Sequence, residues 1–262
     1  MGNKPHQYVM EKSLQAAGLD TRYVTFEVAE KDVANALLGL ESLGFHGAQI
    51  DSPLQRRVAE LLDNKTQRAT DANSVDLIYR DHAGQFIGDS TTGLALVSGL
   101  QRHVDLTDKQ FLLFGNVPWL GSVVLCLLEQ GAERIVIASD DSDLRSQSQP
   151  WCDKKPIRVI SLSDLGHGGE LVSTDCVINT LDSASLPWDS WLVDLPPEAI
   201  LADVGLNPSS SALVSFAKSI GCDCFDGLGW MMEQYTLAFA HWTGLKPDQR
   251  LMREALEEFL MV

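Results

Sequence analysis

The residues best placed to do chemistry lie where an apolar stretch meets a helix, in the sequence FLLFGNVPWLG (111–121). A strand that runs into a glycine and leaves on a helix is typical of a dinucleotide-binding βαβ unit, where backbone N–H groups hold a pyrophosphate. Gly115 fits this pattern. Val117 stands where a second glycine is needed, Pro118 lacks an N–H donor, and Trp119 fills space. The sequence therefore predicts the βαβ frame with a weakened phosphate site.

Three acidic residues, Asp51, Asp76 and Asp89, flank short strand-like segments in the first half of the chain. Gathered at one cleft, they could raise a carboxylate pKa enough to make a general base. As solvated loop ends they would do no chemistry. We favour the solvated arrangement, and the alternative stays open.

Cysteine and histidine spacing predicts no metal site. The five cysteines form no CxxC pair, Cys222 and Cys224 lack histidine partners, and the six histidines are scattered. A structural zinc site needs about four such ligands. We expect no metal and the reduced thiols of a cytosolic protein.

Alternating helices and strands must position these residues. In the first hundred residues, helical spacing covers 6–20 and 32–47, strand-like alternation covers 21–28 (TRYVTFEV), and 75–88 predicts a hairpin that turns at Ala83-Gly84. Further strands are expected at 110–115, 134–139, 156–162, 175–180, 199–205 and 222–227, with helices at 120–130, 212–221, 230–244 and 247–260.

This alternation predicts an α/β fold with parallel βαβ winding. We expect two domains. The first covers 1–96 together with a C-terminal helical part, 229–262, that returns to it, and the second is a Rossmann-like parallel-sheet domain at 97–228.

Composition excludes several classes of partner. The chain has 262 residues, with 20 Lys+Arg against 36 Asp+Glu and a formal net charge of −16. Such a field repels nucleic acid and anionic membranes. No apolar run reaches the roughly 18 residues of a membrane span, and the N-terminus has no signal-like segment, so we expect a cytoplasmic protein.

Taken together, these segments resemble the shikimate dehydrogenase family across nearly the whole chain. The family motifs D-x-x-Y-N-P and G-L-x-M-L-x-x-Q…F-x-x-W-T-G resemble ADVGLNP (202–208) and DGLGWMMEQYTLAFAHWTG (226–244). Three earlier segments occupy the positions of family motifs but share few residues with them: GAQIDSPLQRRV (47–58), ANSVDLI (72–78) and GDSTTG (88–93). The resemblance implies a substrate-binding α/β domain followed by a Rossmann domain.

Carried over by position, the family's functional residues are mostly replaced. The catalytic lysine position holds Gln55 and its partner aspartate position holds Thr92. That pair handles a proton as hydride moves to the nicotinamide, and neither replacement titrates near neutral pH. At substrate positions, Asp76 replaces an asparagine and Asp51 a threonine, while Gln234 is unchanged. We expect the chain to begin after the family's paired serines, which then have no counterpart.

The cofactor positions implied by the resemblance are Gly115, Asn116, Val117, Ser139 and Asp140. Asp140 stands where an arginine meets the 2′-phosphate of NADP. An acid there repels that phosphate and could accept a hydrogen bond from the ribose of NAD. Alternatively it is a solvated turn residue, which we favour. We therefore predict no firm cofactor, and NAD rather than NADP if either binds.

Three functions remain open at this point: an oxidoreductase of the shikimate/quinate type with altered residues, a non-catalytic relative that binds a small metabolite or a regulatory partner, and a structural or assembly protein. The site, not the fold, must decide between them. We predict a shikimate dehydrogenase-like protein of the aromatic amino acid biosynthesis lineage, with weak, altered or absent activity. A shikimate-like metabolite is the expected ligand, and a homodimer or a protein partner stays open.

Overall fold

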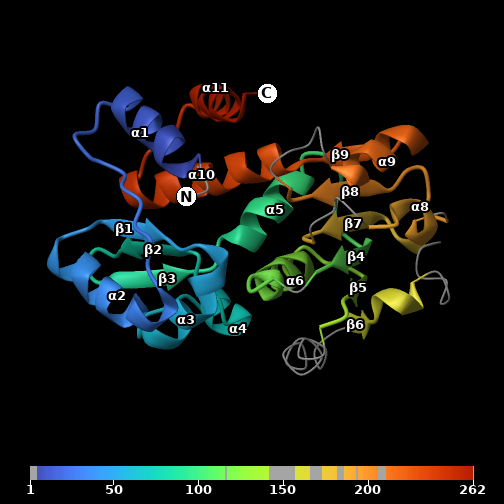
Figure 1. Ribbon diagram of the computed structural model, residues 1–262, viewed down its shortest axis with the longest axis horizontal. Helices are drawn as coiled ribbons and strands as arrows, with labels where there is room; N and C mark the ends of the chain where they lie inside the picture. The colour runs from blue at the N-terminus through green and yellow to red at the C-terminus, as the bar shows by residue number, and fades with distance from the viewer. Residues whose placement is uncertain are drawn as a thin grey trace. The chain divides into compact units, whose positions relative to one another are not determined.

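The structure is a computed structural model that describes residues 5–115, 117–141, 157–165, 173–181, 186–192, 194–205 and 211–261. The chain divides into two compact units (Figure 1). One comprises Met1–Thr91 with Met231–Val262, and the other comprises Thr92–Trp230. Each unit is α/β, as the alternation of helix and strand predicts.

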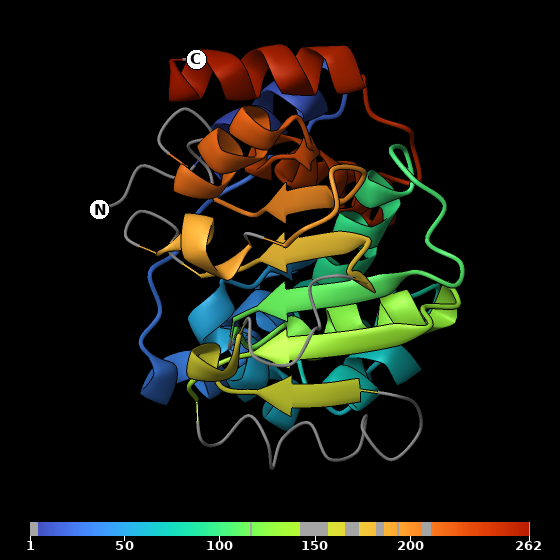
Figure 2. The same cartoon turned by 90° about the vertical axis from the view of Figure 1, so that its right-hand side faces the viewer.

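The second unit is built on a parallel sheet. Within the described residues its six strands lie in the order β6-β5-β4-β7-β8-β9, and their arrows point the same way in Figure 2. The strands are β4 (Gln110–Phe114), β5 (Arg134–Ala138), β6 (Ile157–Ile160), β7 (Cys176–Asn179), β8 (Ile200–Asp203) and β9 (Asp223–Phe225). The order reverses between β4 and β7, which makes their carboxyl ends the switch point where doubly wound sheets bind ligands. The predicted Rossmann-like sheet is confirmed.

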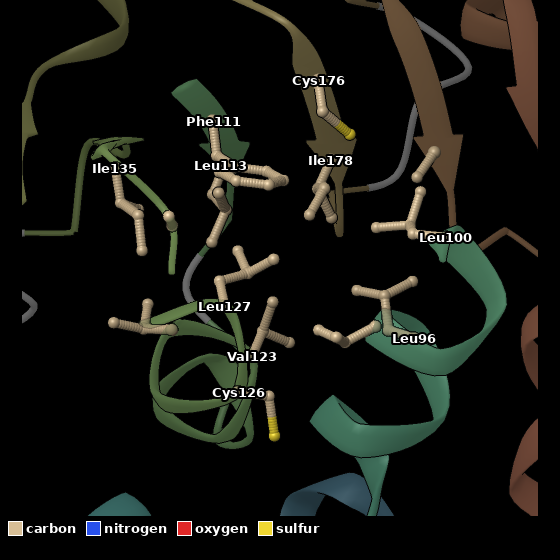
Figure 3. Packing of buried hydrophobic residues seen from close by; sticks show 14 of the residues in the cluster. Leu96, Leu100, Phe111, Leu113, Val123, Cys126, Leu127, Ile135, Cys176 and Ile178 are labelled. Carbon is tan, nitrogen blue, oxygen red and sulfur yellow. The ribbon is translucent and has the colours of Figure 1, made fainter. Parts of the chain in front are cut away.

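Helices cover both faces of this sheet because the central strands are apolar on both faces. α5 (Thr92–Leu100) and α6 (Leu120–Glu129) pack on one face, where Leu96, Val123 and Leu127 point toward Phe111 and Leu113 of β4 (Figure 3). The opposite face is covered by α8 (Trp188–Trp191) and α9 (Ala212–Ile220).

The first unit contains a small antiparallel sheet. In the described chain its order is β1-β2-β3, from β1 (Gly47–Gln49), β2 (Leu77–Arg80) and β3 (Phe86–Asp89). β2 and β3 form the predicted hairpin, with Gly84 at φ 80° in its turn. The helices are α1 (His6–Ala16), α2 (Val33–Ser42), α3 (Gln55–Leu61), α4 (Gln67–Ala72), most of α10 (Gly227–Thr243) and α11 (Gln249–Leu260), with short 3-10 turns at Glu30–Asp32 and Ser52–Leu54; a third such turn, Leu162–Asp164, belongs to the second unit.

The C-terminal helices belong to the first unit. α11 packs on α1, with Lys12 paired to Glu258 at 2.5 Å. In α10 the Trp242 indole N–H donates to the Ile78 carbonyl at 2.9 Å, and a Cβ at Gly47 would collide with that indole. The Trp242 hydrogen bond therefore fixes α10 on the sheet, and the absence of a Cβ at Gly47 leaves room for the indole. No helix among the described residues has the length and apolar character needed to cross a bilayer.

The strand expected at 21–28 is wrong. That segment has no regular secondary structure, and Val24 and Phe26 are 44% and 60% exposed. The physical reason is the lack of a main-chain partner, because alternation alone cannot form a strand without a neighbour to complete its ladder.

Candidate functional site

Gln55, at the start of α3, is buried and hydrogen-bonded at both ends of its amide. Its Nε2 donates to the Ile50 carbonyl at 3.0 Å, and its Oε1 accepts from the Ser74 hydroxyl at 3.2 Å. Its own carbonyl accepts from the Val75 N–H. The side chain therefore links the loop before α3 to the segment before β2, and it has no titratable proton to exchange.

Asp76 lies next to this link and is also buried. Its Oδ1 accepts from both the N–H and the hydroxyl of Thr91, at 2.8 and 2.6 Å. A carboxylate with two such donors is held in a fixed orientation. The structure thus brings Gln55 and Asp76 together through Ser74 and Val75, in an arrangement that satisfies its own polar groups.

Asp89 and Asp51 do not form one carboxylate cluster with Asp76. Asp89 is 2% exposed and accepts from the Thr66 hydroxyl at 2.6 Å and from Arg68 at 3.2 Å, which makes it half of a structural ion pair. Asp51 is exposed. Burial, and to a lesser degree Asp51, raises the pKa of Tyr23, so that phenol stays neutral at physiological pH.

Gln234, on α10, is half-buried, and its amide has no hydrogen-bond partner among the described residues. Within the described chain, its amide is therefore left for a ligand. Thr92, the other expected member of the catalytic pair, opens α5 in the second unit with 3% exposure. Its side chain offers a hydroxyl, which does not titrate near neutral pH.

The expected phosphate loop begins at Gly115, with φ 144°, directly after β4. Trp119 is buried against Trp230, with ring centroids 5.2 Å apart, and Val117 packs on the same apolar cluster. Asn116 lies outside the described residues. The expectation that Val117 or Trp119 lies over a pyrophosphate position stays a prediction.

Some N–H groups at the N-terminus of α6 are bonded within its first turn. The Leu120 N–H donates to the Val117 carbonyl and the Ser122 N–H to the Trp119 carbonyl, both at 3.0 Å. Pro118 has no N–H at all. In an open helix start the first donors are free to bind an anion. Here the Leu120 and Ser122 N–H groups are instead bonded within the first turn.

Asp140 follows β5 and is exposed. Its Oδ1 accepts from the Ser161 hydroxyl and from the Leu162 N–H, both at 3.0 Å, which ties the end of β5 to the turn after β6. Ser139 is buried and accepts from the Asp141 N–H. These contacts support the interpretation of Asp140 as a structural turn residue, with its second carboxylate oxygen still open to a donor.

Thr180, just after β7, shapes the switch point and was missed in the sequence. Its hydroxyl and its N–H both donate to the Phe114 carbonyl, at 2.8 Å each. The same hydroxyl would lie 1.7 Å from a Cβ at Gly115. The available signal was topological: residues after β4 and β7 meet because the strand order reverses there.

Gly115→Ala is therefore expected to destabilise the fold by about 2–3 kcal/mol, from positive-φ strain combined with the collision with Thr180. Chemical denaturation measures this loss. Adding Thr180→Ala should recover part of it, since the colliding oxygen is then gone. Gly131→Ala is the matched control, because Gly131 has φ 84° but more room for a Cβ, and it should cost less. Equal losses at both glycines would contradict this role for Gly115.

The described cysteines form no reactive site. Cys126 and Cys176 are buried and form no disulfide, and burial raises the pKa of the Cys176 thiol. Burial with nearby carboxylates, led by Asp226, raises the pKa of Cys224 to about 12. The thiols of Cys176 and Cys224 therefore stay protonated at neutral pH and are poor nucleophiles.

Together, a sheet with the 3-2-1-4-5-6 strand order, a glycine turn at its switch point and a separate α/β unit define an α/β protein with a Rossmann-type sheet. Residues 7–78 match the family model described as the shikimate dehydrogenase substrate binding domain. The chain is 30% identical to the shikimate dehydrogenase (NADP(+)) of Pyrococcus abyssi, over 93% of this chain and 89% of that one. It belongs to the shikimate dehydrogenase family.

Other relatives agree. The shikimate dehydrogenase (NADP(+)) of Desulfitobacterium hafniense is 27% identical over 95% of this chain and 91% of its own length. Among solved structures, shikimate 5-dehydrogenase from Listeria monocytogenes in complex with shikimate and NAD superposes with a TM-score of 0.88 at 21% identity, covering 98% and 93% of the two chains. A 5-ketofructose reductase from Gluconobacter gives 0.86 at 24% identity, covering 98% and 94%. At these identities the structural likeness shows the fold.

Proposed function

We propose that this chain is a shikimate dehydrogenase-like protein of the lineage that interconverts shikimate and 3-dehydroshikimate, with its own dehydrogenase activity absent or lowered by orders of magnitude. The observation that carries this proposal is Gln55. At the family's lysine position it supplies an amide whose donor and acceptor are already bonded to Ile50 and Ser74. The relatives' names support the lineage.

The role we propose for the site is binding without turnover. Gln234 keeps a free amide in a half-buried position, which suits a hydroxyl-bearing metabolite. The buried Asp76 places a carboxylate where the family carries a neutral amide. That charge disfavours an anionic ligand, so a shikimate-like molecule should bind more weakly than in an active relative.

A thermal-shift screen with shikimate, quinate, NAD and NADP tests this proposal. Shikimate or quinate at about ten times its Kd should raise the melting temperature by about 2–6 °C, because binding to the folded state adds stability. Gln234→Ala should abolish the shift. Gln249→Ala, an exposed glutamine on α11, should leave it intact. A shift that survives Gln234→Ala, or no shift with either acid, would count against binding at this site.

An oxidoreductase of low activity that uses NAD is the second candidate. The observation that favours it is the exposed Asp140 at the end of β5, where an acid accepts from the ribose hydroxyls in NAD enzymes. Its Oδ1 accepts the hydrogen bonds from Ser161 and Leu162, and its Oδ2 has no partner among the described residues. If this candidate is correct, the protein turns over its substrate with NAD, and Asp140→Asn lowers the rate of that reaction.

A further inference from the structure

A cavity of about 270 Å³ lies in the second unit, on the sheet face that α8 and α9 cover (Figure 1). Its lining comes from α8, from the chain that leads on to β8, and from α9: Asp189, Leu192, Leu195, Pro197, Phe216 and Ile220. Phe216 and Ile220 are four residues apart on α9 and therefore share one face of that helix. The cavity thus lies between α9 and the segment that joins α8 to β8.

This cavity is at the amino ends of the parallel strands. Pro197 lies shortly before β8, and Ile220 lies shortly before β9. The Cys222 thiol donates to the Pro197 carbonyl at 3.5 Å, which shows that these two approaches to the sheet are neighbours. Doubly wound sheets bind their ligands at the opposite, carboxyl ends of the strands. The cavity is therefore a different site from the switch point.

The walls of the cavity are apolar. Leu192 and Leu195 are 1% and 8% exposed and belong to the apolar cluster beneath α8 and α9, and Phe216 packs on that cluster. Pockets with such walls hold the apolar part of a small molecule. The volume is just below the usual range of about 300–1,000 Å³, so the cavity suits one aromatic ring or one branched alkyl group.

Asp189 is the one charged residue of this lining. It is exposed, and its carboxylate has no hydrogen bond or ion pair with another residue of the described chain. A carboxylate beside apolar walls attracts a cation and repels an anion. The lining therefore combines an apolar compartment with a single negative charge.

The neighbouring chain adds negative charge. Residues 188–198 contain Asp189, Asp194 and Glu198 and no basic residue. Burial and, after it, Glu198 raise the pKa of the Cys222 thiol, which places the Glu198 carboxylate near the side of the cavity that Pro197 lines. A second acid thus lies close to the site.

The basic residue of α9 does not neutralise the cavity. Lys218 is two residues from both Phe216 and Ile220, about 200° around the helix from each, and so lies on the opposite face. Burial raises the pKa of the Cys224 thiol and Lys218 acts against that rise, which places the ammonium group toward β9. The charge at the cavity is therefore negative.

We propose that this cavity binds a small apolar amine, with its aromatic or branched alkyl group among Leu192, Leu195 and Phe216 and its ammonium group at the Asp189 carboxylate. Burial of the apolar group supplies most of the affinity. The ion pair at an exposed carboxylate adds less, and it sets the preference for a cation. A carboxylic acid of the same shape is repelled, and an alcohol of the same shape binds through its apolar part alone.

The test is an NMR titration of the full chain with three probes of matched shape: phenethylamine, phenethyl alcohol and phenylacetate. Phenethylamine should bind with a Kd of about 1 mM or tighter. The alcohol should bind about two- to fivefold more weakly, which is the usual effect of an exposed ion pair. Phenylacetate should bind at least about tenfold more weakly than the amine. Added salt should reduce the difference between amine and alcohol, because exposed charges are screened.

Four variants at exposed positions locate the binding. Asp189→Asn should remove the preference for the amine and leave binding of the alcohol unchanged. Asp194→Asn, outside the lining, is its matched control and should retain the preference. Ile220→Trp should fill the cavity and abolish binding of both probes, whereas Ser219→Trp, its neighbour outside the lining, should not. Circular dichroism checks that each variant is folded.

Several results would overturn the proposal: no binding of phenethylamine, equal binding of phenylacetate, or the same behaviour of the two asparagine variants. Binding that survives Ile220→Trp in a folded protein would place the amine elsewhere. Gln234→Ala should leave phenethylamine binding unchanged, because Gln234 belongs to the other unit. If that variant abolished it, the amine would bind at the expected substrate site and the cavity would be wrongly assigned.

Discussion

In the presence of saturating shikimate and NADP, the protein is expected to reduce the cofactor at least about 10²–10⁴-fold more slowly than an active shikimate dehydrogenase. That range is the usual contribution of a positioned acid or base, and here both expected partners are missing. Gln55 is a bonded amide and Thr92 is a buried hydroxyl. Against a median turnover of about 10 per second, the expected rate falls below about 0.1 per second.

Absorbance of NADPH measures this rate, with the Pyrococcus abyssi relative assayed in parallel. Gln55→Lys combined with Thr92→Asp should raise any residual activity, because it restores groups that can exchange a proton. Gln55→Met combined with Thr92→Val is the control that removes the same side chains without adding an acid or base. No gain in the first variant over the second would mean that these two positions are assigned wrongly. Turnover by the unchanged protein within about tenfold of the median would refute the account of the pair.

Dinucleotides are expected to bind in the millimolar range or more weakly, about −4 kcal/mol. Pro118 lacks an N–H, and the N–H groups of Leu120 and Ser122 are bonded within the first turn of α6. A pyrophosphate therefore finds fewer donors than at an open helix start. NAD should bind more tightly than NADP, because Asp140 repels a 2′-phosphate and can accept from a ribose hydroxyl.

Isothermal titration calorimetry with both dinucleotides measures these affinities. Asp140→Arg should narrow or reverse the preference for NAD, since a guanidinium attracts the 2′-phosphate. Asp164→Arg, a charge change of the same size in the turn after β6, is the control and should change the preference less. Micromolar binding of either dinucleotide, or tighter binding of NADP by the unchanged protein, would contradict this account of the loop.

Three residues of the family-like motifs, Gly93, Asp203 and Trp242, have packing or hydrogen-bonding roles in the fold. Gly93 lets α5 cross α6, because a Cβ there would lie 2.3 Å from the Ser122 backbone. Asp203 accepts from the Gly205 N–H and from Asn179, joining the ends of β7 and β8. Trp242 bonds to the Ile78 carbonyl. Packing can therefore preserve these positions whether or not the chain turns over a substrate.

The parallel sheet was predictable because its central strands are short apolar runs between helical segments. β4, β5, β7 and β8 are buried nearly throughout, which produces that pattern directly. The segment 21–28 has an equally good strand pattern and forms none. Its outcome depends on a partner strand, which local sequence does not specify.

The replaced site residues could be named from the sequence, but their contacts could not. Ser74 is 19 residues from Gln55, and Thr91 is 15 residues from Asp76, so these hydrogen bonds exist only after the first unit has folded. The same holds for Thr180, which reaches the Phe114 carbonyl across 66 residues. The sequence predicted that the residues at positions 55 and 92 cannot exchange a proton near neutral pH. The structure adds that Gln55 links two segments of the first unit through hydrogen bonds.

The measurement that tests the central claim most directly is hydride transfer itself. The protein, purified from a host without shikimate dehydrogenase, is incubated for a long period with NADP and shikimate that carries deuterium on the carbon bearing the oxidised hydroxyl. Mass spectrometry then follows deuterium in NADPH, which detects turnover far below the limit of an absorbance assay. The account predicts that label either stays at the level of a protein-free control or accumulates at least about 10²-fold more slowly than with an active relative. Label that accumulates in proportion to protein concentration, at a rate near that of an active relative, would contradict it.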